Sequence, residues 1–168
     1  MSGSSFEDPA AESPGFLLWQ VNLAWQREIT AALRPLGLTH VQFVLLACSW
    51  WLGRSGDEPN QVDVANQSGT DPKMTSEVLR KLEAAGLIVR SVDAKDTRAR
   101  RVRVTEVGAE LAKRAVGVVE DADASFFGSE AAAATSVLRA LRARREDLRG
   151  PAGGDTHERP PSTGQPSS

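Results

Sequence analysis

The chain has 168 residues, of which 40% are hydrophobic and 25% are charged, and its formal net charge is −2 at pH 7. This length and composition are typical of one globular domain that buries a substantial core without disulfides or metals. No apolar run approaches the length that a bilayer requires, so we expect no transmembrane helix and no membrane partner. The single cysteine, Cys48, excludes an internal disulfide, and the N-terminus lacks the pattern of a secretion signal, so we expect a cytoplasmic protein.

The two ends of the chain are rich in proline, glycine, serine and threonine, which bury little surface. We therefore expect disordered tails over residues 1–13 and 149–168, and one folded domain over residues 14–148. Apolar residues at three- and four-residue steps predict a first helix over residues 14–34, and Pro35 ends it.

Capping patterns mark the next three helices. Gln42 follows Thr39 by three residues, which is the pattern of a capping box at the start of a helix. Residues 60–85 then combine a short helix, a turn that contains Gly69, and a longer helix capped by Asp71. Two helices joined in this way are the signature of a helix-turn-helix. The short helix carries Val62, Val64 and Ala65, and the residues of the longer helix expected to face the core are Met74, Val78, Leu79 and Leu82.

After this helix pair the periodicity changes from helical to extended. Residues 87–92, LIVRSV, are rich in β-branched side chains, and residues 101–104, RVRV, alternate strictly, so two short strands joined by a polar loop are predicted. The alternation turns the valines of the second strand to the core, and Arg101 and Arg103 outward. A helix-turn-helix followed by a hairpin is the winged-helix arrangement, so the predicted fold is mainly α with a small β-hairpin.

Positive charge is concentrated in this part of the chain. Residues 71–104 contain nine basic and five acidic side chains, a net +4, whereas the rest of the chain carries −6. Such asymmetry indicates one face that meets a polyanion. The second helix of such a pair fits the major groove of DNA, about 12 Å wide, and the hairpin beside it can reach phosphates or the neighbouring minor groove. Double-stranded DNA is therefore the predicted partner.

At residues 82–108 the sequence LEAAGLIVRSVDAKDTRARRVRVTEVG resembles the MarR (multiple antibiotic resistance regulator) family of bacterial transcription factors. The positions that match the family pattern are Leu82, Glu83, Gly86, Leu87, Arg90, Asp93, Asp96, Arg98, Thr105 and Gly108. The helix order over residues 14–148 is also similar to that family. Two positions depart from the pattern: Ala94 stands where proline is usual, and Glu77 stands in the second helix of the pair, where many members carry arginine.

The resemblance implies a homodimer in which the first and the last two helices of each chain pack together. The predicted helices at residues 106–127 and 130–148 agree, because they carry more apolar positions than one small winged domain can cover. We therefore expect dimerisation helices at about residues 14–34 and 106–148, and a DNA-binding lobe at about residues 39–105. Two-fold symmetry predicts a palindromic operator with half-sites about one helical turn apart.

Basic and hydroxyl side chains of the second helix and the hairpin are the predicted DNA contacts. Arg98 lies near the tip of the loop and is the leading one, while Arg100 and Arg101 are expected to contact phosphate without reading sequence. Asp93 and Asp96 are expected to support the wing by holding an arginine in one orientation. The full predicted set is Lys73, Thr75, Ser76, Arg80, Arg98, Arg100 and Arg101.

Three residues outside this face are predicted effector contacts. The family resemblance implies a small aromatic or phenolic ligand between the dimer helices and the DNA-binding lobe, and Trp50, Trp51 and His40 are the proposed contacts; plain core packing is the alternative for the tryptophans and a surface turn for His40. No cofactor, metal site or catalytic motif is predicted, so we expect a non-enzyme. The expected function is a ligand-responsive repressor. The alternatives are a winged helix that binds only proteins and a regulator that senses oxidation through Cys48.

Overall fold

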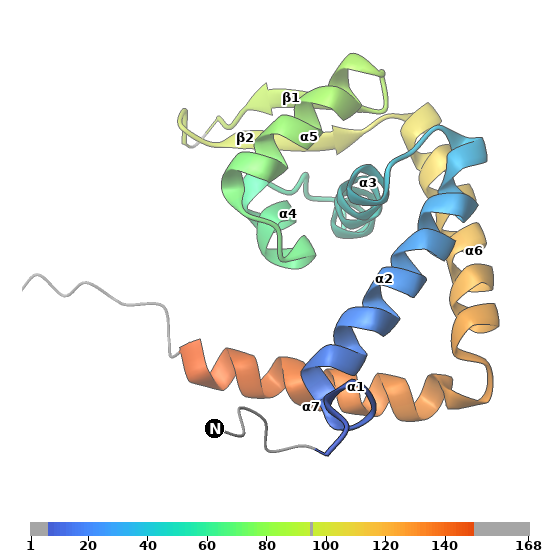
Figure 1. The fold of residues 1–168 in the computed structure, drawn as a ribbon. Helices are drawn as coiled ribbons and strands as arrows, with labels where there is room; N and C mark the ends of the chain where they lie inside the picture. Colours follow the sequence, from blue (N-terminus) through green and yellow to red (C-terminus); the bar gives the residue numbers. More distant parts are fainter. Residues whose placement is uncertain (1–6, 95, 150–168) are drawn as a thin grey trace, which may run out of the picture. The chain divides into compact units, whose positions relative to one another are not determined.

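The computed structural model describes residues 7–94 and 96–149, which fold into helices and one antiparallel hairpin (Figure 1). The chain divides into two compact units, the first ending at Gly128 and the second beginning at Ser129. The elements of the first unit are α1 (Pro9–Glu12), α2 (Pro14–Leu33), η1 (Arg34–Leu36), α3 (His40–Gly53), α4 (Gln61–Ser68), α5 (Pro72–Ala84), β1 (Ile88–Val92), β2 (Arg100–Val104) and α6 (Glu106–Phe127). The second unit holds α7 (Ala131–Arg149), and the short turn η2 (Gly128–Glu130) joins the two. The predicted fold class, mainly α with a small β-hairpin, is confirmed.

Helix α3 is the centre of the winged lobe, because it contacts α4, α5, α6 and β2. The core around it is built mainly from aliphatic side chains, with Ser49 and Thr75 as fully buried polar members, and removing the apolar surface from water is the main stabilising contribution to the lobe. The side chains with less than 2% exposure in this lobe include Leu45, Leu46, Val64, Leu79, Leu82, Ile88 and Val102. Figure 1 shows α4 and α5 beside the hairpin, which is the arrangement that the helix-turn-helix pattern predicts.

Side-chain caps fix where the helices of the lobe begin, as the sequence predicts. Thr39 and Gln42 form a reciprocal capping box on α3, and Asn60 and Asp63 form a second on α4. The carboxylate of Asp71 accepts from the backbone N–H of Met74 at 2.9 Å, which caps α5. These bonds satisfy backbone donors that a helix leaves unpaired at its first turn.

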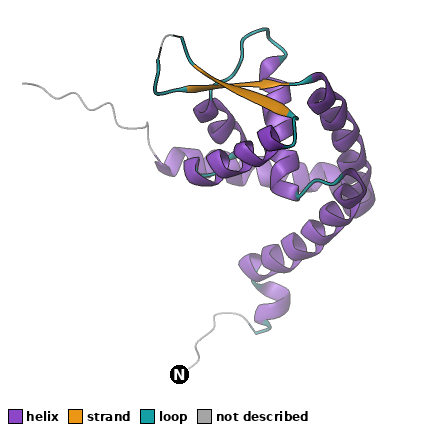
Figure 2. Cartoon of the chain, turned by 90° about the horizontal axis from the view of Figure 1, so that it is seen from above, coloured by secondary structure: helices purple, strands orange, loops and turns teal. Residues whose placement is uncertain are grey.

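The hairpin, hereafter the wing (residues 88–104), is paired in register from Ile88 opposite Val104 to Val92 opposite Arg100 (Figure 2). Alternation along β2 buries Val102 almost completely and leaves Arg103 exposed. The wing is also joined to the segment before α4, since the N–H of Val102 donates to the carbonyl of Pro59 at 2.8 Å. This hydrogen bond attaches β2 of the wing to the rest of the lobe.

The first turn of α6 is fitted tightly against the turn between α5 and β1. The hydroxyl of Thr105 donates toward the carbonyls of Gly86 and Leu87, at 2.8 and 3.1 Å. Gly108 follows one turn later, and a Cβ added there would lie 2.0 Å from the carbonyl oxygen of Leu87. No side chain fits in that gap, so glycine is required by the close approach of the two backbones.

The structure differs from the sequence prediction at a few apolar and terminal positions. Met74, expected to face the core, is 44% exposed, because it lies to one side of the buried face formed by Thr75, Val78, Leu79 and Leu82; Val62 of α4 is 63% exposed. Residues 9–12, expected to be part of a disordered tail, form α1, whose first N–H groups donate to Asp8. The predicted tails at residues 1–6 and 150–168 lie outside the described residues.

Several apolar side chains of α2 and α7 are exposed in the single chain. In α2 they are Phe16, Leu17, Leu18, Trp19 and Val21, and in α7 they are Val137, Leu138 and Leu141. The C-terminal half of α2 is different, since Ile29 and Leu33 are fully buried and α2 contacts α6 there. Within the described ranges, none of the helices is long and apolar enough to span a membrane alone. The pair Pro14–Leu36 and His40–Gly53 is long and apolar enough only when taken together, and it is bent by 73°.

Candidate nucleic-acid interface

Helix α5 presents a charged face to solvent. Its inward positions, Thr75, Val78, Leu79 and Leu82, are buried, and they recur at the spacing of one helical face. The opposite side carries Lys73, Glu77, Arg80 and Lys81, all exposed, while Ser76 is half-buried at the edge. The sequence predicted contacts from Lys73, Ser76 and Arg80, and the structure places these three on the accessible side. Lys81 was not predicted, although its spacing of four residues from Glu77 placed it on the same side.

Thr75 does not lie where the sequence prediction placed it. Its side chain is fully buried, and its hydroxyl donates to the carbonyl of Asp71 at 2.8 Å and lies 2.7 Å from the hydroxyl of Thr70. The Thr70 hydroxyl in turn lies 2.7 Å from that of Ser68. Thr75 therefore holds the turn between α4 and α5 and does not reach a groove. Ser76, which was also predicted to contact DNA, remains accessible, because the buried face at positions 75, 78, 79 and 82 leaves residue 76 at its edge.

An arginine-centred cluster ties the base of the wing to the lobe. Arg101 donates through Nε to the carboxylate of Asp93 and through Nη1 to the backbone carbonyl of Glu58. Asp93 is 5% exposed, so its carboxylate is largely removed from water, whereas the side chain of Arg101 is 33% exposed. Arg103 makes a longer ion pair with Glu58, at 3.4 Å. The sequence predicted that Arg101 contacts phosphate, but in the structure its guanidinium is bound to Asp93 of the wing and to the carbonyl of Glu58 before α4.

A second arginine joins the wing to α5. Arg90 of β1 donates from Nε and Nη2 to one carboxylate oxygen of Glu83, at 2.9 and 2.6 Å, and from its backbone N–H to the other at 3.0 Å. The hydrogen bond from Arg90 lowers the pKa of Glu83, and the nearby charge of Arg100 acts in the same direction. This pair fixes the spacing between the wing and the charged face of α5.

The loop of the wing exposes its remaining arginines. Arg98 and Arg100 are both exposed, and neither makes an ion pair in the described part of the chain. Asp96 accepts the backbone N–H of Arg98 at 3.0 Å, and its own N–H donates to Asp93 at 3.3 Å. The two acids expected to orient an arginine thus have separate tasks. Asp93 holds the side chain of Arg101, and Asp96 shapes the backbone that carries Arg98.

Eight of the nine basic residues of the segment 71–104 lie within the described residues, and they fall into two groups. Arg90, Arg101 and Arg103 are paired with acids inside the lobe. The outward group has no ion pair within residues 7–94 and 96–149, and it consists of Lys73, Arg80, Lys81, Arg98 and Arg100. All five are exposed on α5 or the wing, where a bound duplex would find unpaired positive charge.

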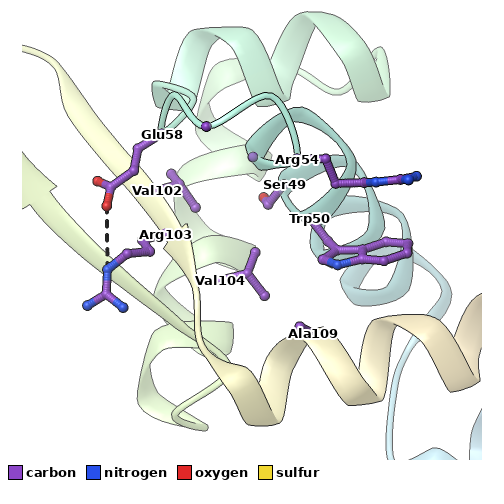
Figure 3. Close-up of a pocket in the computed structure, with 10 residues that line it drawn as sticks. Ser49, Trp50, Arg54, Glu58, Val102, Arg103, Val104 and Ala109 are labelled. Atoms are coloured by element: carbon purple, nitrogen blue, oxygen red, sulfur yellow. Dashed lines mark ion pairs between the residues drawn. The ribbon is translucent and has the colours of Figure 1, made fainter.

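The three predicted effector residues lie in different surroundings. Trp50 borders a cavity of about 410 Å³ whose other walls include Arg54, Val104 and Ala109 (Figure 3). Trp51 is 60% exposed on the other side of Arg54, whose guanidinium carbon lies 5.6 Å from the Trp50 ring centre and 4.9 Å from that of Trp51. Arg54 and the wing residues of the cavity were not predicted, since only the fold brings β2 against the end of α3.

His40 lies apart from that cavity. Its ring packs edge-to-face on Trp25, with ring centres 5.1 Å apart, and the indole N–H of Trp25 donates to Asp123 at 2.7 Å. Burial lowers the pKa of His40, and the charge of Asp123 opposes that shift. His40 thus belongs to a junction of α2, α3 and α6.

Cys48 is partly buried on the packed side of α3, and burial raises the pKa of its thiol. The reactive species in thiol oxidation is the thiolate, so this environment disfavours the oxidation-sensing alternative.

Comparisons with known proteins point to one class. A family model described as an ArnR1-like winged-helix domain matches residues 36–121, which contain α3, α4, α5, the wing and most of α6. The chain is 42% identical over 126 residues to the uncharacterized HTH-type transcriptional regulator YdcH of Bacillus subtilis, covering 75% of this chain and 85% of YdcH. It is 38% identical over 110 residues to the HTH-type transcriptional repressor Rv2887 of Mycobacterium tuberculosis, covering 66% of this chain and 76% of the repressor.

Solved structures extend the likeness to the fold. The crystal structure of the MarR family protein Rv2887 in complex with DNA is similar at 31% identity and a TM-score of 0.59, covering 76% of this chain and 96% of that one. BpsR of Bordetella bronchiseptica, whose DNA binding is regulated by 6-hydroxynicotinic acid, is similar at 26% identity and a TM-score of 0.72, covering 83% of this chain and 98% of that one.

Proposed function

The chain belongs to the MarR family of winged-helix transcriptional regulators, and from that membership we propose that it represses transcription by binding a palindromic operator as a homodimer. A repressor of this kind acts on DNA in the bacterial cytoplasm and needs no catalytic chemistry. The observation that carries the proposal is the outward group of unpaired basic side chains on α5 and the wing. Among the residues that the structure describes, these side chains are exposed and unpaired, whereas Arg90 and Arg101 are half-buried and bound to acids of the same lobe.

In the proposed complex, α5 lies in the major groove and the wing lies over the adjoining backbone. Lys73, Arg80 and Lys81 contact phosphates at the edges of the groove, and Ser76 approaches the bases. Arg98 and Arg100 extend from the wing to the neighbouring phosphates or minor groove, where a narrow groove favours arginine. The Arg90–Glu83 and Arg101–Asp93 pairs hold the wing at the position that allows both contacts.

Dimerisation is proposed through the helices that leave apolar side chains exposed. The N-terminal half of α2 exposes Trp19 by 58%, and α7 exposes Val137 by 58%. Apolar patches of this kind mark surfaces that another protein covers, and a two-fold axis presents the same patch from both chains.

We further propose that a small aromatic or phenolic effector binds at the cavity beside Trp50. The indole offers a stacking surface, Arg54 offers a positive charge, and Val104 connects the cavity to β2 of the wing. If the wing exchanges between two positions, a ligand that binds the chain more tightly in one of them increases the population of that position. DNA affinity then changes with the population.

Selection of bound duplexes from a random DNA pool tests the proposal, followed by titration of the selected site at increasing salt. We expect a palindrome and a steep salt dependence, since a dimer with six to ten phosphate contacts loses roughly 10³- to 10⁵-fold in affinity between about 50 and 200 mM salt. Failure to enrich any sequence, with no salt-dependent binding, would favour a winged helix that binds only proteins. A monomer in sedimentation at the binding concentration would overturn the dimer.

A further inference from the structure

The outward face of α5 contains one acidic side chain among its basic ones. At about 100° per residue, Glu77 lies about 150° from the middle of the buried face formed by Thr75, Val78, Leu79 and Leu82. It is therefore directed almost straight away from the core, one turn after Lys73 and one turn before Lys81. Its side chain is exposed.

Glu77 is the exception among the acids of residues 71–104. The other four each have a structural partner: Asp71 caps α5, Glu83 binds Arg90, Asp93 binds Arg101, and Asp96 accepts the N–H of Arg98. The carboxylate of Glu77 has no hydrogen bond or ion pair with any residue that the structure describes. Within residues 7–94 and 96–149, no hydrogen bond or ion pair therefore accounts for a carboxylate at this position.

A carboxylate facing DNA is repelled by every phosphate, so it weakens binding unless it finds a hydrogen-bond donor on a base. An ionised carboxylate only accepts hydrogen bonds. In the major groove guanine presents two acceptors, thymine an acceptor and a methyl group, and adenine an acceptor beside its amino group, whereas cytosine presents its N4 amino group alone. Cytosine is thus the base whose edge complements Glu77.

We propose that Glu77 determines operator specificity by accepting a hydrogen bond from N4 of one cytosine in each half-site. The inference rests on the proposed placement of α5 in the major groove. Glu77 is the sixth residue of the 13-residue helix α5, within the N-terminal part from which recognition helices contact base edges. Lys73 and Lys81 on either side are placed to hold phosphates, so the repulsion on Glu77 is offset locally.

The test compares selections from a random DNA pool for the parent chain, Glu77→Gln and Glu77→Ala. The parent should enrich a cytosine at one position of each half-site, and replacing it should weaken binding by roughly 5- to 150-fold per half-site. Glu77→Gln should shift that position toward adenine, because an amide pairs with the N6 and N7 atoms of adenine. Glu77→Ala should lose the preference there and keep the preferences at other positions.

A matched control separates base reading from charge. Glu110→Gln changes the charge equally at an exposed site on α6, where the carboxylate contacts Lys113, and it should leave the selected sequence unchanged. If Glu77→Gln and Glu77→Ala select the parent's sequence and bind all DNA more tightly by the same factor, Glu77 is only a repulsive charge and the inference is overturned. If the parent chain enriches no sequence at all, the proposed function fails and the inference fails with it.

Discussion

Two parts of the winged lobe use the same residue types in opposite ways. At the base of the wing, Arg90 and Arg101 are bound to Glu83 and Asp93, and their hydrogen bonds fix the wing to α5 and to the segment before α4. On the outer side, a few residues away in sequence, Arg98 and the other basic side chains of the outward group are exposed and unpaired within the described residues.

The difference shows that local net charge does not identify a binding surface. A +4 segment is consistent with nine potential DNA contacts, but three of its nine bases are neutralised by acids within the lobe. We therefore expect the paired arginines to contribute to DNA affinity indirectly, by holding the unpaired ones in position. Substitutions on the two sides should therefore separate into losses of folding stability and losses of DNA affinity.

The largest loss of folding stability is expected at Gly108, where α6 packs against the turn between α5 and β1. Gly108→Ala places a Cβ against the backbone oxygen of Leu87, which cannot move without displacing the start of β1. Overpacking of this kind costs about 3 kcal/mol of the free energy of unfolding. Urea unfolding monitored by tryptophan fluorescence measures it.

Gly117→Ala is the matched control for that substitution. Gly117 lies in the same helix, and apart from its chain neighbours and the backbone of that helix, no atom of the described residues lies within 4 Å of an added Cβ there. Alanine should therefore stabilise α6 by up to about 1 kcal/mol through its higher helix propensity. Equal stability losses in the two variants would mean that the close approach at Gly108 does not constrain the wing.

The next effect distinguishes a paired arginine from an unpaired one. Arg98→Ala should weaken operator binding by about 1–3 kcal/mol per contact and leave the free energy of unfolding within about 0.5 kcal/mol. Arg101→Ala removes the guanidinium from the nearly buried Asp93, and it should cost about 2 kcal/mol of stability. Fluorescence anisotropy on labelled operator and urea unfolding, applied to both variants, give the two quantities. An Arg98→Ala variant that binds operator as tightly as the parent across a salt titration would remove the wing from the interface.

The sequence predicts the fold well because the signals are local. The capping boxes, the Asp71 cap and the strict alternation of residues 101–104 each act over a few residues, so they identify the helix pair and the wing without tertiary information. The two acids of the loop at residues 93–98, which would repel DNA as free charges, predict their pairing with an arginine in general terms.

Local sequence did not predict which arginines are paired with acids inside the lobe and which are left unpaired. Arg101 and Arg98 have similar neighbours in sequence, and what separates them is the carbonyl of Glu58, which lies 43 residues away from Arg101 and reaches it only through the fold. The burial of Thr75 depends likewise on the packing of α5 against α3 and α4. Residue type alone selected the exposed Lys73 and Arg80 and the buried Thr75 alike, whereas helical phase separates them.

The smallest expected effect concerns the pair that joins α5 to the wing. Glu83→Gln keeps an oxygen that can accept the backbone N–H of Arg90, and it removes the charge that binds the guanidinium. Because the pair is partly exposed, the loss at neutral pH should be small, about 0.5 kcal/mol.

The pH dependence of that loss identifies its cause. The bond from Arg90 lowers the pKa of Glu83 in the folded chain below the ordinary value of about 4.3, so the unfolded chain binds more protons between the two values. The stabilisation is therefore fully present above about pH 4.3 and is lost as the pH falls through the lowered pKa. Urea unfolding of the parent and of Glu83→Gln at pH 7 and again below pH 4 should show two curves that converge in acid. A difference that persisted in acid would assign the effect to packing and not to charge.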